Sequence, residues 1–112
     1  MNSFEQEYAC DVAESKVILR GIFRLASPSE YDKIFDPIKQ ALENNTQETP
    51  CIDVTYAVFL NSAGITALSR LVILARTRNR PLEITGSAKS PWQKKSLPPL
   101  TKLYERLHVK LT

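Results

Sequence analysis

A strand–helix–strand unit in the middle of the chain constrains the fold more than any other feature of the sequence. The run Cys51–Val54 is short and mostly apolar. It is followed by helical spacing of apolar residues from Ser62 to Arg78 and by a second apolar run, Leu82–Thr85. A helix between two such strands is typical of the crossover that joins parallel neighbours in one sheet. The sequence therefore predicts an α/β domain whose sheet is mainly parallel.

The segments before this unit are expected to add a hairpin and a helix. Glu7–Val12 and Lys16–Ile22 have the composition of two antiparallel strands. Ser27–Glu30 matches a capping box with proline at the first helical position, and the amphipathic helix that follows should bend at Pro37 and end at residues 44–46. The apolar stripe of this helix is predicted to be core; it consists of Tyr31, Ile34, Phe35, Ile38 and Leu42.

The remaining segments are less regular in pattern. Tyr56–Leu60 is predicted to be a loop between the strand and the helix of the central unit. Ser87–Leu97 lacks clear periodicity, although Ser90 and the proline after it can begin one helical turn. A last helix is expected from Pro98, and Val109–Leu111 is expected to be a terminal strand. The element order is then ββαβαβαβ, with one antiparallel hairpin at its start.

Composition and charge narrow the class of protein. The apolar fraction of 43% and the charged fraction of 24% are close to the globular average, and 112 residues suit a single domain over positions 1–112. No apolar run is long enough to span a membrane, and the start of the chain carries acids where a secretory signal is basic, so a cytoplasmic location is expected. Residues 1–56 carry 10 acidic and 5 basic side chains, whereas residues 57–112 carry 2 acidic and 10 basic ones.

The basic C-terminal half suits an acidic protein surface, a nucleic acid or no charged partner at all. Trp92 lies near Lys89, Lys94 and Lys95, and an aromatic residue among basic ones can stack on single-stranded nucleic acid. A single tryptophan more often packs over the edge of a sheet, so nucleic acid is an unlikely partner.

The sequence contains no recognisable catalytic motif. It has one histidine and three scattered glycines. It contains no phosphate-loop, dinucleotide-binding, nucleophile-elbow or zinc-protease motif. The one conceivable nucleophile–base pair joins Cys10 or Cys51 to His108, but both thiols fall in predicted strands among apolar residues, where cysteine is usually inert core. The chain is interpreted as non-enzymatic, with reduced thiols and no cofactor or metal.

The most distinctive segment is Cys51–Arg70, which reads CIDVTYAVFLNSAGITALSR. A buried strand that ends in Asp53, a short linker and the tetrapeptide Asn61–Gly64 before an apolar helix form a specific combination. This resembles the STAS domain, the sulfate-transporter and anti-sigma-factor-antagonist family. The resemblance implies a STAS-like α/β fold with a four- to five-stranded mixed sheet, mostly parallel, and helices packed mainly on one side.

The resemblance also implies a function in bacterial signal transduction by partner switching. Ser62 corresponds to the serine that anti-sigma-type serine kinases phosphorylate, Gly64 to the glycine after it, and Asp53 to a supporting acidic residue; Asn61 stands where the family usually has aspartate. The unmodified protein would bind the kinase or another anti-sigma-type regulator, and phosphorylation would weaken that contact until a phosphatase of the PP2C type restored it. ATP would belong to the kinase.

General physical chemistry gives the serine a rationale of its own. Ser62 would lie in the first turn of a helix, where free backbone N–H groups and the positive dipole end suit a phosphate. Asn61 can cap the helix and, being neutral, would not repel that phosphate. The alternative is that Asn61 and Ser62 only cap and begin a helix.

The outer face of the same helix is the expected partner surface. Placed at about 100° per residue, Ile73 lies at the centre of a face that also carries hydroxyl and arginine side chains. The predicted partner-binding residues are Asn61, Ser62, Ala63, Gly64, Thr66, Ser69, Arg70 and Ile73. An exposed Ile73 would be a docking residue, although single exposed isoleucines are also common. The alternative function is a non-phosphorylated STAS-like scaffold or small-ligand-binding module.

Overall fold

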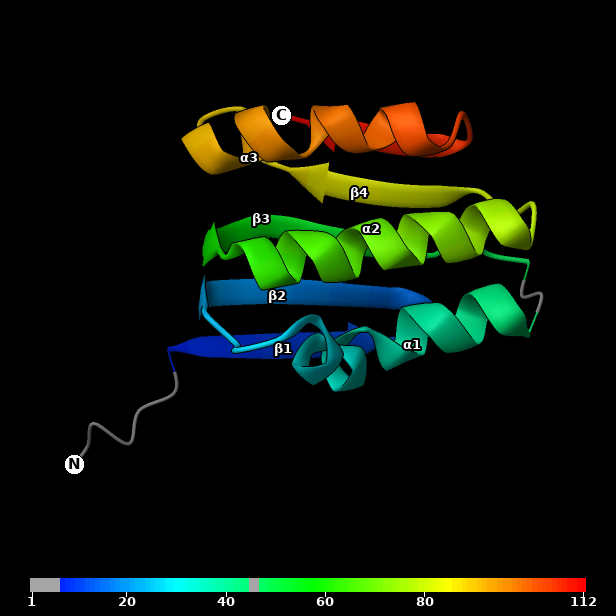
Figure 1. Cartoon of the computed structure of the whole chain (residues 1–112), viewed down its shortest axis with the longest axis horizontal. Coiled ribbons are helices and arrows are strands. Elements are labelled where there is room, and N and C mark those ends of the chain that lie inside the picture. Colours follow the sequence, from blue (N-terminus) through cyan, green and yellow to red (C-terminus); the bar gives the residue numbers. More distant parts are fainter. Residues whose placement is uncertain (1–6, 45–46) are drawn as a thin grey trace.

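The computed structural model describes residues 7–44 and 47–112 (Figure 1). The expectations that fall on residues 1–6, Asn45 and Thr46 lie outside the described residues. The elements, in chain order, are β1 (Tyr8–Ala13), β2 (Lys16–Phe23), the 3-10 helix η2 (Pro28–Tyr31), α1 (Asp32–Glu43), β3 (Cys51–Leu60), α2 (Ser62–Thr77), β4 (Leu82–Gly86), α3 (Pro91–Ser96), the 3-10 helix η3 (Pro98–Leu103) and β5 (Leu107–Leu111).

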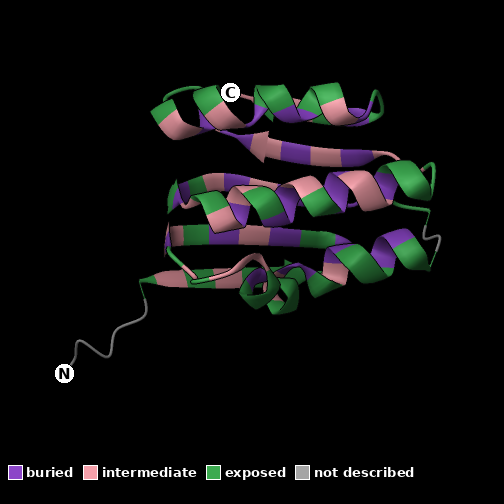
Figure 2. Cartoon of the chain, viewed as in Figure 1, coloured by how far each residue is buried: buried purple, intermediate pink, exposed green. Residues whose placement is uncertain are grey.

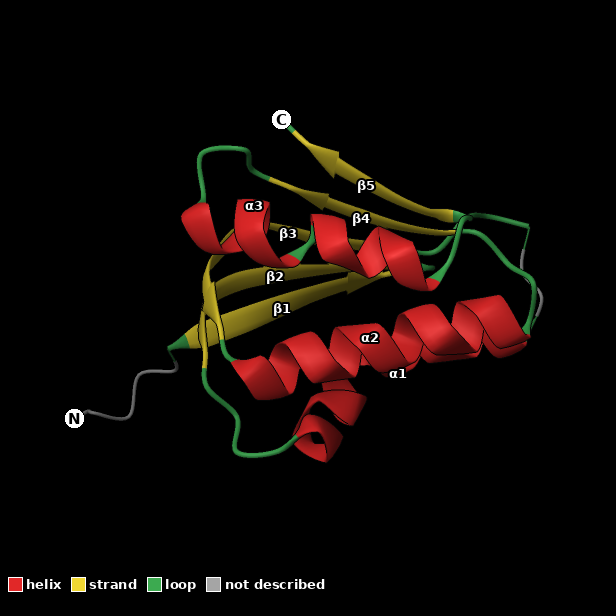
Figure 3. Cartoon of the chain, turned by 45° about the horizontal axis from the view of Figure 1, so that its top comes forward, coloured by secondary structure: helices red, strands yellow, loops and turns green. Residues whose placement is uncertain are grey.

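The strands form one five-stranded sheet in the order β1-β2-β3-β4-β5. β1 is antiparallel to β2, and each later strand is parallel to its neighbour. Figure 3 shows the helices gathered on one face of this sheet, as right-handed crossovers between parallel neighbours require. The predicted fold class is therefore confirmed: the chain is α/β, with a mostly parallel mixed sheet and helices on one side.

The core lies between the sheet and the helices (Figure 2). Its buried side chains form one cluster, to which alternate residues of β2, β4 and the first half of β3 contribute, in agreement with the two-residue period of a strand. Of the predicted stripe before and within α1, Tyr31, Phe35, Ile38 and Leu42 are buried and Ile34 is half-buried, which confirms that this face is core. Burial of each large side chain contributes about 1.5–3 kcal/mol.

The prediction of a loop at Tyr56–Leu60 is wrong, because this segment is the second half of β3. Pairing with β2 continues to Leu60, but two register shifts interrupt it, one on each side of the Arg20–Tyr56 pair. Each shift is a bulge, which adds a residue to one strand and breaks the alternation of buried and exposed positions. An alternation interrupted in this way could not be recognised from the sequence.

The predicted capping box at Ser27–Glu30 is also wrong in its detail. The side chain of Ser27 makes no capping hydrogen bond to the backbone. Its Oγ lies 3.0 Å from Oγ of Ser29 and donates to Oε2 of Glu30 at 3.3 Å. The turn that follows is a 3-10 helix, and the helix predicted at Pro98 is likewise of the 3-10 type. Proline favours the start of both turns because its φ angle is fixed near the helical value. It has no backbone N–H group, however, to donate a hydrogen bond within a longer helix.

The segment Ser87–Leu97 contains a structural device that periodicity did not indicate. β3 pairs with β4 only over Cys51–Asp53, so the second half of β3 has a free edge there. Gln93 of α3 is fully buried against that edge. Its Nε2 donates to the carbonyl oxygens of Val54 and Ala57 at 2.7 and 3.3 Å, and its Oε1 accepts from the amide of Ser87 at 2.7 Å. One amide side chain thus replaces the missing strand partner.

Candidate functional site

The candidate site is the N-terminal end of α2, where Asn61 is the N-cap residue. Oδ1 of Asn61 accepts from the amide of Gly64 at 3.1 Å and from the hydroxyl of Tyr31 at 2.6 Å, and its Nδ2 donates to the carbonyl oxygen of Leu25 at 2.8 Å. Burial raises the pKa of Tyr31, so its hydroxyl keeps the proton that it donates. These bonds fix the start of α2 against the segment that enters η2.

The same bonds explain why asparagine stands at position 61. An aspartate could accept from Gly64 and Tyr31, but an ionised carboxylate has no proton to donate to Leu25. A carboxylate oxygen would then face the carbonyl oxygen of Leu25 at hydrogen-bond distance. Asparagine at position 61 is therefore matched to the local hydrogen bonds of this chain.

Gly64 lets the helix begin close to the core. A Cβ atom at this position would lie 2.3 Å from Cδ1 of Leu60 and 3.0 Å from Cζ of Tyr31, both of which are buried. Any other residue would push α2 away from these two side chains. Gly64 is thus a packing requirement for the position of the helix and is not accessible to a partner.

Ser62 is the first residue of α2 and is exposed, as predicted. In the part of the chain that the structure describes, its hydroxyl takes part in no hydrogen bond, and it stands beside the capped amide of Gly64. The first amides of a helix have no partners within the helix, and the dipole is positive at this end. A hydroxyl presented here is accessible to an enzyme, and an anion attached to it is favourably placed.

The predicted partner surface is only partly accessible. Ser62, Thr66 and Arg70 are exposed and follow one another at helical spacing along α2. Ser69 is half-buried, and its Oγ donates to the carbonyl oxygen of Ile65 at 3.0 Å. Ala63 is half-buried against the core. The accessible part is therefore a narrow polar stripe, to which Ser69 adds little hydrogen-bonding capacity.

The expectation that Ile73 is exposed is not met, because its side chain is half-buried. Ile73 lies one turn before Arg76, whose guanidinium donates to the carbonyl oxygen of Leu103 in η3 at 3.1 Å. Residues three apart share one side of a helix, so Ile73 is on the side of α2 that faces η3. The 3-10 helix beside α2 makes Ile73 a weaker docking residue than the sequence predicted.

Asp53 does not close its strand, which corrects the sequence prediction. It lies inside β3, and its Oδ1 accepts from the amide of Thr55 at 2.9 Å, at the first bulge. Burial alone would raise the pKa of Asp53, but hydrogen bonds from Thr55 and Thr85 and the charge of Lys16 hold it below its ordinary value. Asp53 therefore supports the shape of β3, whereas the position of Ser62 is fixed by the hydrogen bonds that Asn61 makes at the start of α2.

The two cysteines are free and half-buried. Burial raises the pKa of both thiols, which favours the unreactive protonated form. In the sheet register Cys51 is opposite Glu83, and Glu83 is opposite His108, so one strand separates the thiol from the imidazole. Cys10 packs against the core on the helix-covered face. The candidate thiol–imidazole pair is thus not assembled among the described residues.

Trp92 packs over the sheet edge, as the sequence analysis favoured. Its Nε1 donates to the carbonyl oxygen of Ala57 at 3.0 Å, and its ring is half-buried against the core. Lys89, Lys94 and Lys95 are exposed. The indole N–H group and part of the ring of Trp92 are thus used in packing within the chain.

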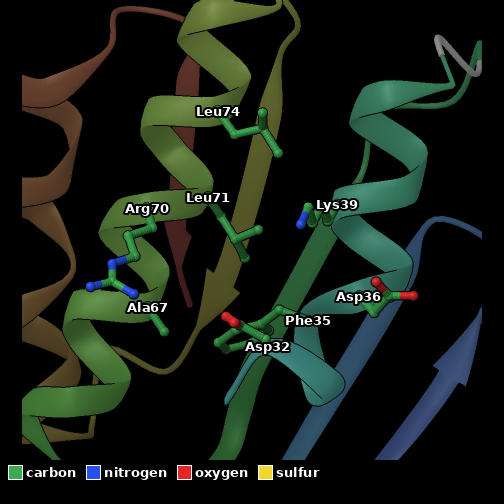
Figure 4. A pocket seen from close by; sticks show the side chains of 8 residues that line it. All are labelled: Asp32, Phe35, Asp36, Lys39, Ala67, Arg70, Leu71 and Leu74. Carbon is green, nitrogen blue, oxygen red and sulfur yellow. The ribbon is translucent and has the colours of Figure 1, made fainter. Parts of the chain in front are cut away.

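A groove lies between α1 and α2, with a volume of about 240 Å³. Its apolar lining comes from Phe35, Ala67, Leu71 and Leu74, and its charged lining from Asp32, Asp36, Lys39 and Arg70. Figure 4 shows Leu71 and Leu74 reaching from α2 toward α1, whereas the guanidinium group of Arg70 turns away from it. The groove borders the polar stripe of α2 through Arg70.

No protein-family model, curated protein or solved structure matches the chain. Within residues 7–44 and 47–112, no helix combines the length and the apolar run that crossing a bilayer requires. In the same ranges no group of three or more histidine, cysteine, aspartate or glutamate side chains could hold a metal ion. The geometry at the start of α2 therefore has to be interpreted on its own chemistry.

Proposed function

We propose that the chain is a non-enzymatic signalling protein of the anti-sigma-antagonist type, whose binding to a protein partner is switched by phosphorylation of Ser62. The observation that carries this proposal is the exposed hydroxyl of Ser62 at the first position of α2, beside a cap that is itself bonded to Gly64, Tyr31 and Leu25. Because Asn61 is fixed by these internal bonds, it would stay in place as the cap when its neighbour carries a phosphate.

A phosphate on Ser62 would change a surface without unfolding the domain. It adds about −1.5 to −2 charges at pH 7 and three acceptor oxygens, and it stands where the helix dipole stabilises an anion. The first cation along the stripe is Arg70, two turns further on and about 12 Å away along the axis. The phosphate would keep most of its charge, and a partner that fits the neutral stripe would lose affinity.

The modification is tested on the chain isolated from the cells that produce it. Phosphopeptide mass spectrometry should place phosphate on Ser62 in part of the population. Thr66 is the matched control, because its hydroxyl is also exposed and lies one turn further on the same stripe. Phosphate on Thr66 alone, or on neither residue under every growth condition, would contradict the proposal.

The switch itself is tested by affinity capture from the same cells. Ser62→Ala should retain a protein kinase or regulator, whereas Ser62→Glu should retain much less of it. Thr66→Glu places the same charge one turn away and should have a smaller effect, because it lies beyond the last free amide of α2. Equal capture by Ser62→Ala and Ser62→Glu would count against a switch at this position.

The alternative function, a small-ligand-binding module, has the groove between α1 and α2 in its favour. Its mixed apolar and charged lining would suit a small amphipathic molecule. The volume of about 240 Å³ is below the range of roughly 300–1,000 Å³ that is usual for ligand pockets. The phosphorylation switch is therefore the function that the site supports best.

A further inference from the structure

The face of the sheet opposite the helices carries exposed aromatic side chains together with charged ones. On each of the five strands, the residues that do not point into the core lie on this face. Its large and charged side chains are Asp11 of β1, Lys16, Ile18, Arg20 and Ile22 of β2, Asp53, Tyr56 and Phe59 of β3, Glu83 of β4, and His108 and Lys110 of β5. We refer to this surface as the open face.

The second half of β3 is aromatic on the open face. Tyr56 is 57% exposed and Phe59 is 39% exposed, although both belong to the central strand. The guanidinium of Arg20 lies 4.8 Å from the centre of the Tyr56 ring, and that of Arg24 lies 5.7 Å from the Phe59 ring. Arginine stacking orders these rings but leaves much of their area in water. Exposed aromatic side chains on a central strand are typical of an interface.

We propose that a second copy of this chain covers the open face, in a dimer whose twofold axis runs along β3 between the two facing sheets. In this arrangement β3 faces β3 of the second copy, β2 faces β4, and β1 faces β5. Two sheets that pack face to face lie about 10 Å apart with nearly aligned strands, and a symmetric pair uses the same patch on both copies. Tyr56 and Phe59 would then lie on the axis, beside β2 and beyond the rows in which β3 pairs with β4.

Charge complementarity across the axis supports this choice of partner. One register row contains Asp11 on β1 and Lys110 on β5, and another contains Lys16 on β2 and Glu83 on β4. Because the axis exchanges β1 with β5 and β2 with β4, Asp11 faces Lys110 and Glu83 faces Lys16 of the second copy, in addition to the pairs Asp11–Arg20 and Glu83–Lys110 within one copy. A twofold axis across the strands would instead place β1 against β1 and β5 against β5, so Asp11 and Lys110 would not face each other.

One position on the axis carries a cost. Asp53 lies on β3 and would face Asp53 of the second copy. Its carboxylate accepts from the amide of Thr55 at 2.9 Å, and Lys16 lies near enough to favour its charge. These local interactions compensate part of the repulsion within each copy. For the dimer to form, the aromatic contacts and the four ion pairs that symmetry produces must stabilise it by more than the remaining repulsion between the two Asp53 carboxylates destabilises it.

The size of the open face is compatible with a dimer. Five strands spaced by about 4.8 Å, each five to ten residues long at about 3.3 Å per residue, cover on the order of 500 Å² per copy, and the total of about 1,000 Å² reaches the lower limit for a specific interface. The stripe with Ser62 is on the opposite side of the molecule, so this proposal does not depend on the proposed function.

Sedimentation of the whole chain at physiological salt tests the proposal. The wild type should show a concentration-dependent change from 12.7 kDa to twice that mass. Tyr56→Glu should sediment as a monomer, because it places two like charges at the axis. Its melting temperature should change little, since the side chain is exposed. Lys94→Glu on α3 is the control and should remain dimeric. A wild type that is monomeric at every concentration would leave the face to another partner and overturn the proposal.

A charge exchange tests the orientation of the two copies. Lys16→Glu and Glu83→Lys should each weaken the dimer, and the double variant should recover most of the loss, because the two positions face each other across the axis. Glu83→Lys also breaks the exposed pair between Glu83 and Lys110, whose loss affects folding little. A double variant that dimerises no better than the worse single variant would contradict the arrangement.

Cross-linking gives an independent measure. Cys51 lies on β3 and would face Cys51 of the second copy near the axis. In a Cys10→Ser background, a short bis-maleimide should convert the chain into a covalent dimer, and Tyr56→Glu should abolish this product. Failure to cross-link at concentrations where the chain sediments as a dimer would show that the dimer uses another face.

Discussion

Two amide side chains anchor helices near the carboxyl-terminal half of β3, and they do so with different consequences. Asn61 joins the start of α2 to Leu25 and Tyr31, and it leaves the next residue, Ser62, exposed. Gln93 joins α3 to the free edge of β3 and is itself fully buried. The first arrangement fixes a backbone and presents a hydroxyl, whereas the second only closes the sheet. The proposed regulatory site therefore differs from the structural joint in what it leaves accessible.

The largest effect is expected at the structural joint. Gln93→Ala would leave the carbonyl group of Val54 and the amide of Ser87 without their buried partner, at about 1–3 kcal/mol for each unsatisfied group, whereas the carbonyl group of Ala57 keeps its bond from Trp92. We expect a loss of about 3 kcal/mol or more in urea-induced unfolding. Gln40→Ala on the exposed side of α1 is the control and should change stability by less than about 0.5 kcal/mol. A loss below about 1 kcal/mol at Gln93 would show that water replaces its bonds.

A smaller loss is expected when the packing beneath Asn61 is changed. Gly64→Ala gains up to about 1 kcal/mol in helix propensity but forces a methyl group against Leu60 and Tyr31, which costs about 1–3 kcal/mol. The net result should be destabilisation of about 1 kcal/mol, measured by the same unfolding experiment. Ser62→Ala, two residues earlier and exposed, should be close to neutral. Stabilisation by Gly64→Ala would mean that Leu60 moves aside freely.

Asn61→Asp tests the donor side of the cap without removing the cap. The aspartate retains the acceptor for Gly64 and Tyr31 but loses the donor to Leu25 and brings two oxygen atoms together. We expect a loss of about 1–2 kcal/mol at neutral pH. The loss should diminish at a pH where the new carboxyl is protonated and can donate again. Unchanged stability would contradict the role given to the amide.

The smallest effect is expected at Asp53. Its pKa is held below its ordinary value of 3.8, so its ionised form stabilises the folded chain above that pH, and the contribution is lost as the pH falls through the folded-state pKa. Asp53→Asn should therefore lower stability modestly at neutral pH and flatten the acid limb of the stability profile. An unchanged acid limb would show that Asp53 does not carry this dependence.

The sequence predicted the parts of the fold that depend on local patterns. The helix at Ser62 and the strand at Leu82 were found by periodicity, and the exposure of Ser62 followed from its position at a helix start. The second half of β3 was missed because two bulges break its alternation. Gln93 was missed because its bonds join residues far apart in the chain and leave no periodic trace. The partial burial of Ile73 depends on η3, which only the tertiary fold brings beside α2.

The central claim is that a phosphate on Ser62 changes partner binding and leaves the fold intact. The most direct test is to prepare the chain with phosphoserine at position 62 and to measure its affinity for the partner captured by Ser62→Ala. We predict binding at least about tenfold weaker than that of the unmodified chain, which corresponds to about 1.4 kcal/mol, with an unchanged melting temperature. Equal affinity of the two forms, or loss of binding that accompanies unfolding, would contradict the account.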